Sequence, residues 1–269
     1  MANFRDKSVI VTGSSSGIGE AAALMFAGKG ANMTVCGRDE LRLREIVEAC
    51  LKAGQEAGHS NRVITVSGDL SSADVRAETI DKTVEAFGKL DILVVNHGAY
   101  HAARGMNDVT EEIFDSIIDK NVKSVLFLIK QAVPHLEKTG GSVVVTSSIA
   151  STLSTVGNIA YNISKAAVDH MMRNLALELG PKGIRINATN PTYTKTRIFR
   201  DLPPAFLNGR SFKAVSEGHP LHGRHSNPEE QAEVILFLAS DAARDSAGIP
   251  LVSAGHRKRL TRTCPERVL

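Results

Sequence analysis

The sequence predicts an α/β fold, with one doubly wound parallel sheet of about seven strands and helices on both faces. Short apolar runs alternate with longer helical stretches along the 269 residues, and this alternation is typical of a parallel sheet. Most of the short runs are uniformly apolar, as in parallel strands that are covered on both faces. A glycine-rich turn follows the first run directly and opens the first helical stretch.

These runs place the elements in order. Strands are expected at residues 8–12, 32–36, 62–66, 92–95, 142–146, 184–188 and 249–252. Helices are expected at residues 19–29, 40–53, 73–87, 111–136, 164–179 and 228–239. The helix at 111–136 carries one apolar stripe, on which Asn121 falls. No repeat or linker interrupts the pattern, so we expect a single domain over residues 1–255.

Two segments break this rhythm. Residues 197–227 contain three prolines and no clear periodicity, and so long a connection is more often functional than filler. We expect a substrate lid there, with a disordered insertion as the alternative. His219, His222 and His225 recur within it, but proline and glycine deny them a helix, so no metal site is expected. Residues 256–269 hold five Lys or Arg and one acid, a basic tail whose plain interpretation is a disordered extension.

Composition narrows the function. The chain has no Trp and three Tyr, which disfavours a platform for stacking nucleic-acid bases. No run reaches the ~18 apolar residues of a membrane span, and no signal peptide is visible. Three scattered cysteines, without a CxxC pair, fit a reducing compartment. We therefore expect a soluble, cytoplasmic protein with no nucleic-acid or membrane partner, an organelle remaining open.

The turn TGSSSGIG at residues 12–19 predicts a dinucleotide site. Gly13 permits the tight turn, while Gly17 and Gly19 allow close backbone approach and packing of the helix on the sheet. Free N–H groups at the helix start then face a pyrophosphate. The spacing GxxxGxG differs from the commoner GxGxxG, but a strand before it and a helix after it supply the required context.

The end of the second strand indicates which dinucleotide binds. An acid there would bind the ribose 2′-hydroxyl of NAD, whereas an arginine would accommodate the 2′-phosphate of NADP. Gly37 stands where the acid is expected, and Arg38 follows it. We expect NADP(H) to be preferred, with NAD(H) possible because Asp39 and Glu40 lie close by. A solvated loop charge is the plain interpretation of Arg38.

Tyr161 and Lys165 are four residues apart and would share one face of a helix. Lowering the pKa of a phenol from ~10 to about 7 needs roughly 4 kcal/mol of preferential phenolate stabilisation. A nearby ammonium supplies stabilisation of that sign, which makes Tyr161 a candidate acid/base. Ser148 lies thirteen residues upstream. The plain alternative for the pair is a surface helix.

These motifs, in this order and spacing, resemble the short-chain dehydrogenase/reductase family from residue 8 to about residue 255. Further matches are Asp69-Leu70, the VNHG stretch at 95–98 and the stretch 191–196. The resemblance implies a Rossmann-like fold and the catalytic set Asn121, Ser148, Tyr161 and Lys165. It also implies a cofactor site formed by Gly13, Ser15, Ser16, Gly17, Ile18, Gly19, Arg38, Asp69, Leu70, Asn96, Gly98, Tyr161, Lys165, Pro191, Thr192, Thr194 and Thr196.

The resemblance assigns a role to each catalytic residue. Tyr161 exchanges a proton with the substrate oxygen, and Lys165 lowers the pKa of the tyrosine and holds the ribose hydroxyls of the cofactor. Ser148 donates a hydrogen bond to the substrate oxygen as charge develops there. Asn121 anchors a water in the proton relay. The alternative for Asn121 is a packing or capping amide, since a buried amide needs partners.

Several positions depart from the family pattern. Val95 and His97 replace the first asparagine and the alanine of the family's NNAG motif, and a packed neutral imidazole is the plain interpretation of His97. Thr192 replaces the glycine that usually follows Pro191, and a β-branched residue there is costly if the backbone needs positive φ. VSAG stands at 252–255 in place of VDGG, in a region that often makes subunit contacts.

We therefore expect an NADP(H)-dependent carbonyl reductase or alcohol dehydrogenase that acts on a ketone or secondary alcohol. Apolar residues near the site and in the lid favour a small or medium, largely apolar substrate: Leu153, Val156, Leu202, Phe206, Leu207 and Phe212. The rival is a non-catalytic dinucleotide-binding or scaffold protein that retains the fold. The broad apolar face of the helix after Tyr161 predicts a homotetramer or homodimer.

Overall fold

The computed structural model describes residues 3–101, 105–154, 156–200 and 224–252. Its centre is a seven-stranded sheet in the order β3-β2-β1-β4-β5-β6-β7, in which all neighbouring strands are parallel. The strands are β1 (Ser8–Thr12), β2 (Asn32–Gly37), β3 (Val63–Ser67), β4 (Ile92–Val95), β5 (Ser142–Thr146), β6 (Arg185–Asn190) and β7 (Pro250–Val252). The predicted doubly wound parallel sheet is confirmed.

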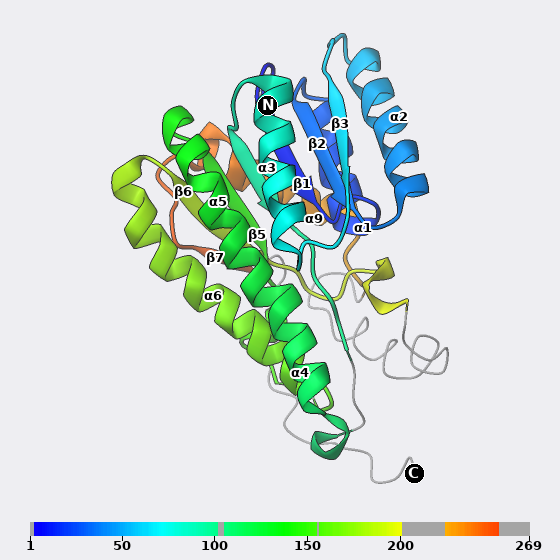
Figure 1. Cartoon of the computed structure of the whole chain (residues 1–269), viewed down its shortest axis with the longest axis vertical. Helices are drawn as coiled ribbons and strands as arrows, with labels where there is room; N and C mark the ends of the chain where they lie inside the picture. Colours follow the sequence, from blue (N-terminus) through cyan, green and yellow to red (C-terminus); the bar gives the residue numbers. More distant parts are fainter. Residues whose placement is uncertain (1–2, 102–104, 155, 201–223, 253–269) are drawn as a thin grey trace.

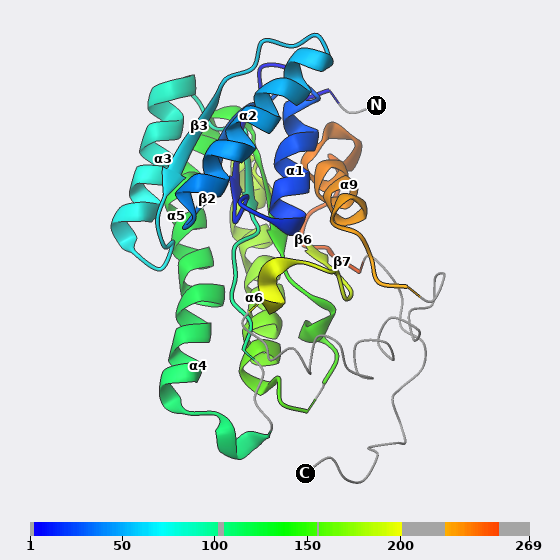
Figure 2. The ribbon, with the colours of Figure 1, turned by 90° about the vertical axis from the view of Figure 1, so that its right-hand side faces the viewer.

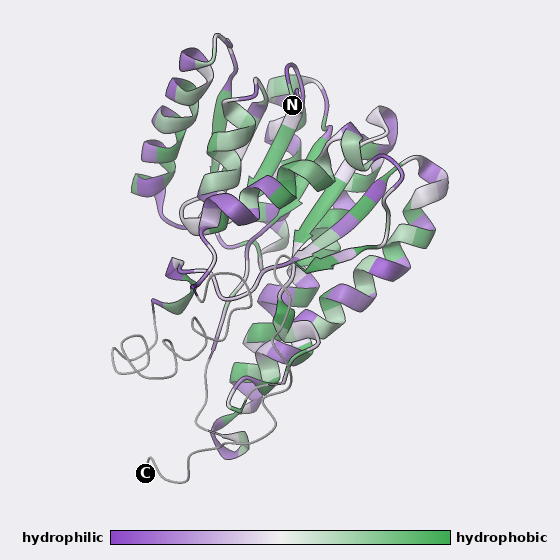
Figure 3. Ribbon diagram, turned by 180° about the vertical axis from the view of Figure 1, so that it is seen from behind, coloured by the Kyte–Doolittle hydropathy of each residue, from purple (hydrophilic) through white to green (hydrophobic). Residues whose placement is uncertain are grey.

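Helices cover both faces of the sheet (Figures 1 and 2). They are α1 (Gly17–Ala27), α2 (Glu40–Glu56), α3 (Ala73–Phe87), α4 (Glu111–Ile118), α5 (Ser124–Thr139), α6 (Ile159–Leu179) and α9 (Pro228–Ala239). One apolar core packs α1, α2 and α9 on one face, and a second packs α3, α5 and α6 on the other. Figure 3 shows apolar strands between helices whose outer faces are largely polar. Among the described residues, no helix is long and apolar enough to span a bilayer.

The strand order positions the site. β1 and β4 pair side by side, although β2 and β3 lie between them in sequence. Connections that leave such a point run in opposite directions and open a crevice beyond the carboxyl ends of the strands. The glycine-rich turn after β1 and the loop after β4 therefore begin next to each other.

Two helices differ from their expected form. The helix expected at 111–136 is divided into α4 and α5 by a π-helical turn at Asp119–Lys123, which contains Asn121. Helix α6 begins at Ile159, earlier than expected, because the backbone carbonyl of Asn158 accepts from the N–H of Asn162 at 2.8 Å. Tyr161 therefore lies inside the helix, one turn before Lys165.

Several expectations fall on residues outside those described. The expected lid is described only at 197–200, where Arg197–Phe199 form a 3₁₀ turn, and at 224–227. His219, His222, the apolar lid residues Leu202, Phe206, Leu207 and Phe212, Cys264 and the basic tail 256–269 all lie outside the described residues.

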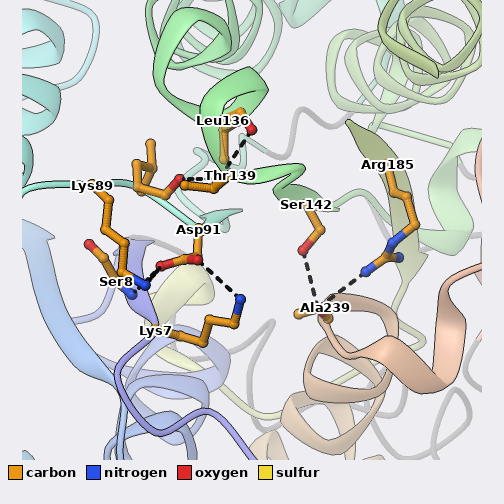
Figure 4. Close-up of polar contacts among 10 residues, drawn as sticks. Lys7, Ser8, Lys89, Asp91, Leu136, Thr139, Ser142, Arg185 and Ala239 are labelled. Carbon is orange, nitrogen blue, oxygen red and sulfur yellow. Dashed lines mark hydrogen bonds and ion pairs between the residues drawn. The ribbon is translucent and has the colours of Figure 1, made fainter. Parts of the chain in front are cut away.

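A buried carboxylate joins the amino end of β1 to that of β4 (Figure 4). Asp91 is 4% exposed, and its Oδ2 accepts from the backbone N–H of Ser8 at 2.9 Å. Its two oxygens also pair with the ammonium groups of Lys7 and Lys89, each at 3.1 Å. The acid thus satisfies a buried backbone donor at the start of β1.

We expect Asp91→Ala to lower the free energy of unfolding by about 1–3 kcal/mol, because the buried N–H of Ser8 loses its acceptor. Denaturant unfolding would measure this loss. Asp245→Ala is the matched control, since the Asp245 side chain is 96% exposed and its arginine partner lies 3.9 Å away. Equal stability of the two variants would contradict the role given to Asp91.

Candidate active site

A cavity of about 770 Å³ opens at the carboxyl ends of the strands. It brings together most of the predicted site residues: Gly13, Ser15, Ser16, Ile18, Arg38, Asp69, Leu70, Asn96, Gly98, Ser148, Tyr161, Lys165, Pro191, Thr192, Thr194 and Thr196. Gly17, Gly19 and Asn121 are not part of the lining. These three residues instead shape the elements from which the lining projects.

The glycine-rich turn is shaped to admit a ligand closely. Gly13 and Gly17 have φ of +65° and +62°, a conformation that favours glycine. A Cβ on Gly19 would lie 2.4 Å from the carbonyl oxygen of Gly13. Ser16 caps α1 without a side-chain hydrogen bond, so the first N–H groups of the helix are available to an anion. The turn therefore fits the pyrophosphate of a dinucleotide.

Ser15, Gly37 and Arg38 all line the cavity. A Cβ on Gly37 would lie 3.1 Å from Ser15 Oγ, so an acid in place of Gly37 would crowd this hydroxyl. Arg38 is more than half exposed and lies 3.9 Å from a carboxylate oxygen of Asp69. Burial would raise the pKa of Asp69, but hydrogen bonds from Ser71 and the charge of Arg38 outweigh it and lower that pKa.

The expected effect of Lys165 on Tyr161 is not what the structure shows. Burial raises the pKa of Tyr161 to about 12, and the hydrogen bond to Ser148 offsets this only in part. The ammonium of Lys165 donates to the carbonyl oxygen of Thr146 at 2.9 Å, and it lies 5.7 Å from the centre of the Tyr161 ring. Burial also lowers the pKa of Lys165 to about 8.

Ser148 is held in place from both sides. Its hydroxyl oxygen accepts from the N–H of Ala150 at 3.1 Å, and its carbonyl oxygen accepts from Asn190 Nδ2 at 3.1 Å. The same Nδ2 donates to the buried carboxylate of Asp169 at 2.8 Å. Asp169 is four residues after Lys165 on α6, and its negative charge acts to raise the pKa of Lys165.

The side chain of Asn121 is occupied by protein partners. Its Oδ1 accepts from the N–H of Ala99 at 2.7 Å, and its Nδ2 donates to the Ala99 carbonyl at 2.9 Å and to Ser164 Oγ at 3.0 Å. Ser164 in turn donates to the carbonyl oxygen of Tyr161 at 2.7 Å. The side chain of Asn121 is therefore a buried amide whose oxygen and nitrogen both have protein partners.

Two departures from the family pattern cause no strain. In the described part of the chain, the one residue other than glycine with positive φ is Asp6, so the threonine at 192 does not meet the backbone penalty considered above. His97 is a packed histidine, and its ring nitrogens lie 2.8 Å from Thr12 Oγ1 and 2.8 Å from Ser124 Oγ. Burial lowers the pKa of His97 to about 3, so the ring is neutral.

Sequence reasoning missed an aromatic wall of the cavity, beside Tyr161. The Tyr100 ring packs edge-on against Tyr161 and Phe199, with centroids 5.0 and 5.1 Å apart. Tyr193 lies 5.2 Å from Phe199, and the Tyr100 hydroxyl donates to Asn158 Oδ1 at 2.7 Å. All three tyrosines of the chain thus meet in one cavity. The chain contains three tyrosines in all, and this scarcity was the sequence signal that could have pointed to them.

The parallel sheet, its reversal of strand order and the glycine-rich turn define the class of dinucleotide-binding α/β proteins. Within that class, the chain belongs to the short-chain dehydrogenase/reductase family. Residues 13–254 match the family profile described as enoyl-(acyl carrier protein) reductase, and full-length relatives agree.

Three known proteins illustrate the relationship. The chain is 30% identical to a 3beta-hydroxysteroid dehydrogenase of Mediterraneibacter gnavus, over 95% of this chain and 96% of the relative. It is 31% identical to a cis-4-hydroxycyclohexanecarboxylate dehydrogenase of Sinomonas cyclohexanicum, over 94% and 96%. A crystal structure of a short-chain dehydrogenase from Burkholderia cenocepacia in complex with NADP superimposes with a TM-score of 0.82, at 29% identity, over 93% of this chain and 97% of that one.

Proposed function

We propose that the protein is an NADP(H)-dependent oxidoreductase that transfers a hydride between nicotinamide and a ketone or secondary alcohol. The observation that carries the proposal is the meeting of Tyr161, Ser148 and Lys165 in the cavity that begins at the glycine-rich turn. The cofactor supplies the hydride. The protein then has to orient the substrate oxygen and to move one proton at it.

In this proposal the phenol of Tyr161 gives its proton to the substrate oxygen during reduction and takes it back during oxidation. Its raised pKa keeps it protonated at neutral pH, which suits the acid role. Ser148 donates to the same oxygen as negative charge develops on it, and Lys165 holds the ribose hydroxyls. The side chain of Asn121 is committed to Ala99 and Ser164, so any bond to a relay water falls to its main chain.

The pKa of Lys165 predicts how reduction depends on pH. With a pKa of about 8, the side chain of Lys165 is a charged ammonium below that pH and loses its charge above it. Tyr161 stays protonated over this range, so it cannot cause the change. If the charged lysine is required, kcat for reduction should be level below pH 7 and fall about tenfold by pH 9.

Lys165→Arg is the control for this profile, because an arginine does not titrate in this range. Its residual activity should show no inflection near pH 8. A wild-type profile that stays level up to pH 10 would contradict the role of the lysine charge.

Arg38 and Ser15 support the preference for NADP(H), and the relative from Burkholderia cenocepacia is in complex with NADP. We expect Arg38→Ala to raise the KM for NADPH by roughly 10- to 100-fold, the effect of losing a charged hydrogen bond to a phosphate. The KM for NADH should change little, since NADH has no 2′-phosphate. Equal effects on the two cofactors would assign another role to Arg38.

We propose a largely apolar substrate whose ketone or secondary alcohol stands on a ring. Tyr100, Phe199 and Leu153 line the cavity beside Tyr161, while Val156 is 87% exposed. Two of the relatives carry names that refer to a hydroxysteroid and a hydroxycyclohexane.

The test is oxidation of NADPH and NADH with pairs of cyclic and linear ketones of equal carbon number. Faster turnover of the linear ketones would contradict the proposal of a cyclic substrate. Tight cofactor binding without turnover of any ketone would favour the non-catalytic scaffold protein.

The assembly remains a proposal of a homotetramer or homodimer. Within α6, Val168, Met172 and Leu179 are buried against the sheet of their own chain, whereas Ile163 and Leu177 on α6 and Phe127 on α5 are exposed. These exposed side chains are those that a second copy would cover. A monomer by light scattering at micromolar concentration would contradict this proposal.

A further inference from the structure

We propose that His97 is a positioning residue of this site and that its ring fixes the π-helical turn that carries Asn121. The inference rests on the proposed function, because it explains how the same site keeps its shape. The family pattern has an alanine at this position, so the device belongs to this chain rather than to the motif.

The His97 ring bridges two elements that meet behind the cavity. On one side its Nδ1 lies 2.8 Å from the hydroxyl of Thr12 at the end of β1. On the other side its Nε2 lies 2.8 Å from the hydroxyl of Ser124, the first residue of α5. The side chains of Thr12 and Ser124 are both buried, so water does not compete for these bonds.

The surrounding bonds favour one tautomer of the ring. Thr12 Oγ1 accepts the N–H groups of Asn96 at 2.9 Å and His97 at 3.2 Å, which leaves its proton to donate. Nδ1 is the nearer acceptor for it, since the Val94 carbonyl lies at 3.2 Å. Ser124 donates its proton to the Lys120 carbonyl at 2.7 Å, so its oxygen accepts from Nε2–H. The protons therefore run in one direction, from Thr12 through the ring to Lys120.

This chain of bonds ends at the backbone carbonyl of Lys120, which the π-helical turn leaves without its usual backbone donor. In an α-helix the N–H of residue 124 would donate to the carbonyl of residue 120. Here the N–H of Ser124 donates to the carbonyl of Asp119, five residues earlier, and the hydroxyl of Ser124 takes over the Lys120 carbonyl. Side-chain bonds of this kind stabilise departures from regular helix. His97 fixes the hydroxyl that makes the replacement.

The π-helical turn controls the catalytic helix through Asn121. Its amide joins Ala99, two residues after His97, to Ser164 on α6. Ser164 lies next to Lys165 and donates to the carbonyl of Tyr161. Two parallel ties, from His97 to Ser124 and from Asn121 to Ala99, therefore fix the turn to the loop after β4. Loss of the first tie would shift the second and, through it, the turn of α6 that carries Tyr161 and Lys165.

Two variants of similar size separate this role from simple packing. The side-chain nitrogen of glutamine can take the place of Nε2 and keep the bond to Ser124, whereas asparagine reaches only the position of Nδ1. We expect His97→Asn to lower kcat about five- to tenfold, the scale of one buried hydrogen bond. His97→Gln should stay within about twofold of wild type, and the KM for NADPH should change less than kcat in both. Equal losses in the two variants would reduce His97 to a packing residue.

Ser124→Ala provides an independent test with a small change in volume. In the Ser124→Ala background, His97→Asn should cause no further loss of kcat, because the hydroxyl that His97 fixes is already gone. Losses that multiply would overturn the inference. Hydrogen exchange of the amides at 119–124 should be faster in His97→Asn than in His97→Gln, and an unchanged rate would also overturn it. If the wild-type protein turns over no carbonyl compound, the proposed function is wrong. If the wild-type protein does turn over a carbonyl compound and His97→Asn leaves kcat unchanged, only the inference about His97 is wrong.

Discussion

Tyr161→Phe is expected to lower kcat by about 10²- to 10⁴-fold, the range that general acid–base catalysis contributes. The change removes one hydroxyl and keeps the ring that packs against Tyr100. The backbone carbonyl that accepts from Ser164 also remains. Fold and cofactor binding should therefore persist, with the loss confined to the proton that the substrate oxygen must gain or lose.

The measurement is turnover of the best ketone together with the Kd for NADPH by calorimetry. Tyr100→Phe is the comparison, because it removes a second phenol hydroxyl and leaves the proposed proton donor intact. The centroids of the Tyr100 and Tyr161 rings lie 5.0 Å apart. The Tyr100 hydroxyl is bound to Asn158, and we expect its loss to lower kcat by less than about tenfold. Comparable losses in the two variants would mean that Tyr161 is not the acid/base.

The elements were predictable where one local signal decides them. The strand runs at 8–12, 92–95 and 142–146 are apolar on both faces, and only a parallel sheet covered on both sides accommodates that pattern. The position of the cavity followed from the same topology, because the carboxyl ends of β1 and β4 must meet at the reversal of strand order. Prediction of the glycine-rich turn needed no tertiary information, since the spacing of its glycines already indicates where another group must approach the backbone closely.

What escaped prediction depends on contacts between distant segments. The apolar stripe looks the same before and after the π-helical turn, and the bonds that stabilise the turn come partly from His97, 27 residues before Ser124. The pKa of Tyr161 depends on how deeply the ring is buried and on where the Lys165 ammonium lies, which four-residue spacing does not determine. The wall of Tyr100, Tyr193 and Phe199 is assembled from separate loops, so no single window of sequence contains it.

Gly19→Ala is expected to be the most damaging single-methyl change in the proposed cofactor site. The new Cβ would lie 2.4 Å from the carbonyl oxygen of Gly13 and 2.5 Å from Asn96 Nδ2. The first of these is a backbone atom in the turn itself, and Asn96 Nδ2 also donates to the Thr12 carbonyl at 3.2 Å. Neither can withdraw without opening the turn, so the N–H groups that would face the pyrophosphate are displaced.

Overpacking of this kind destabilises by about 1–3 kcal/mol, and a displaced turn should weaken NADPH binding by at least roughly tenfold. Thermal unfolding and calorimetric titration would measure the two effects on the same sample. Gly180→Ala is the matched control, because its backbone is helical and nothing lies within 4 Å of the added Cβ. It should be neutral or slightly stabilising. If Gly19→Ala binds NADPH as wild type does, the dinucleotide does not rest on this turn, and the cofactor site proposed here is misplaced.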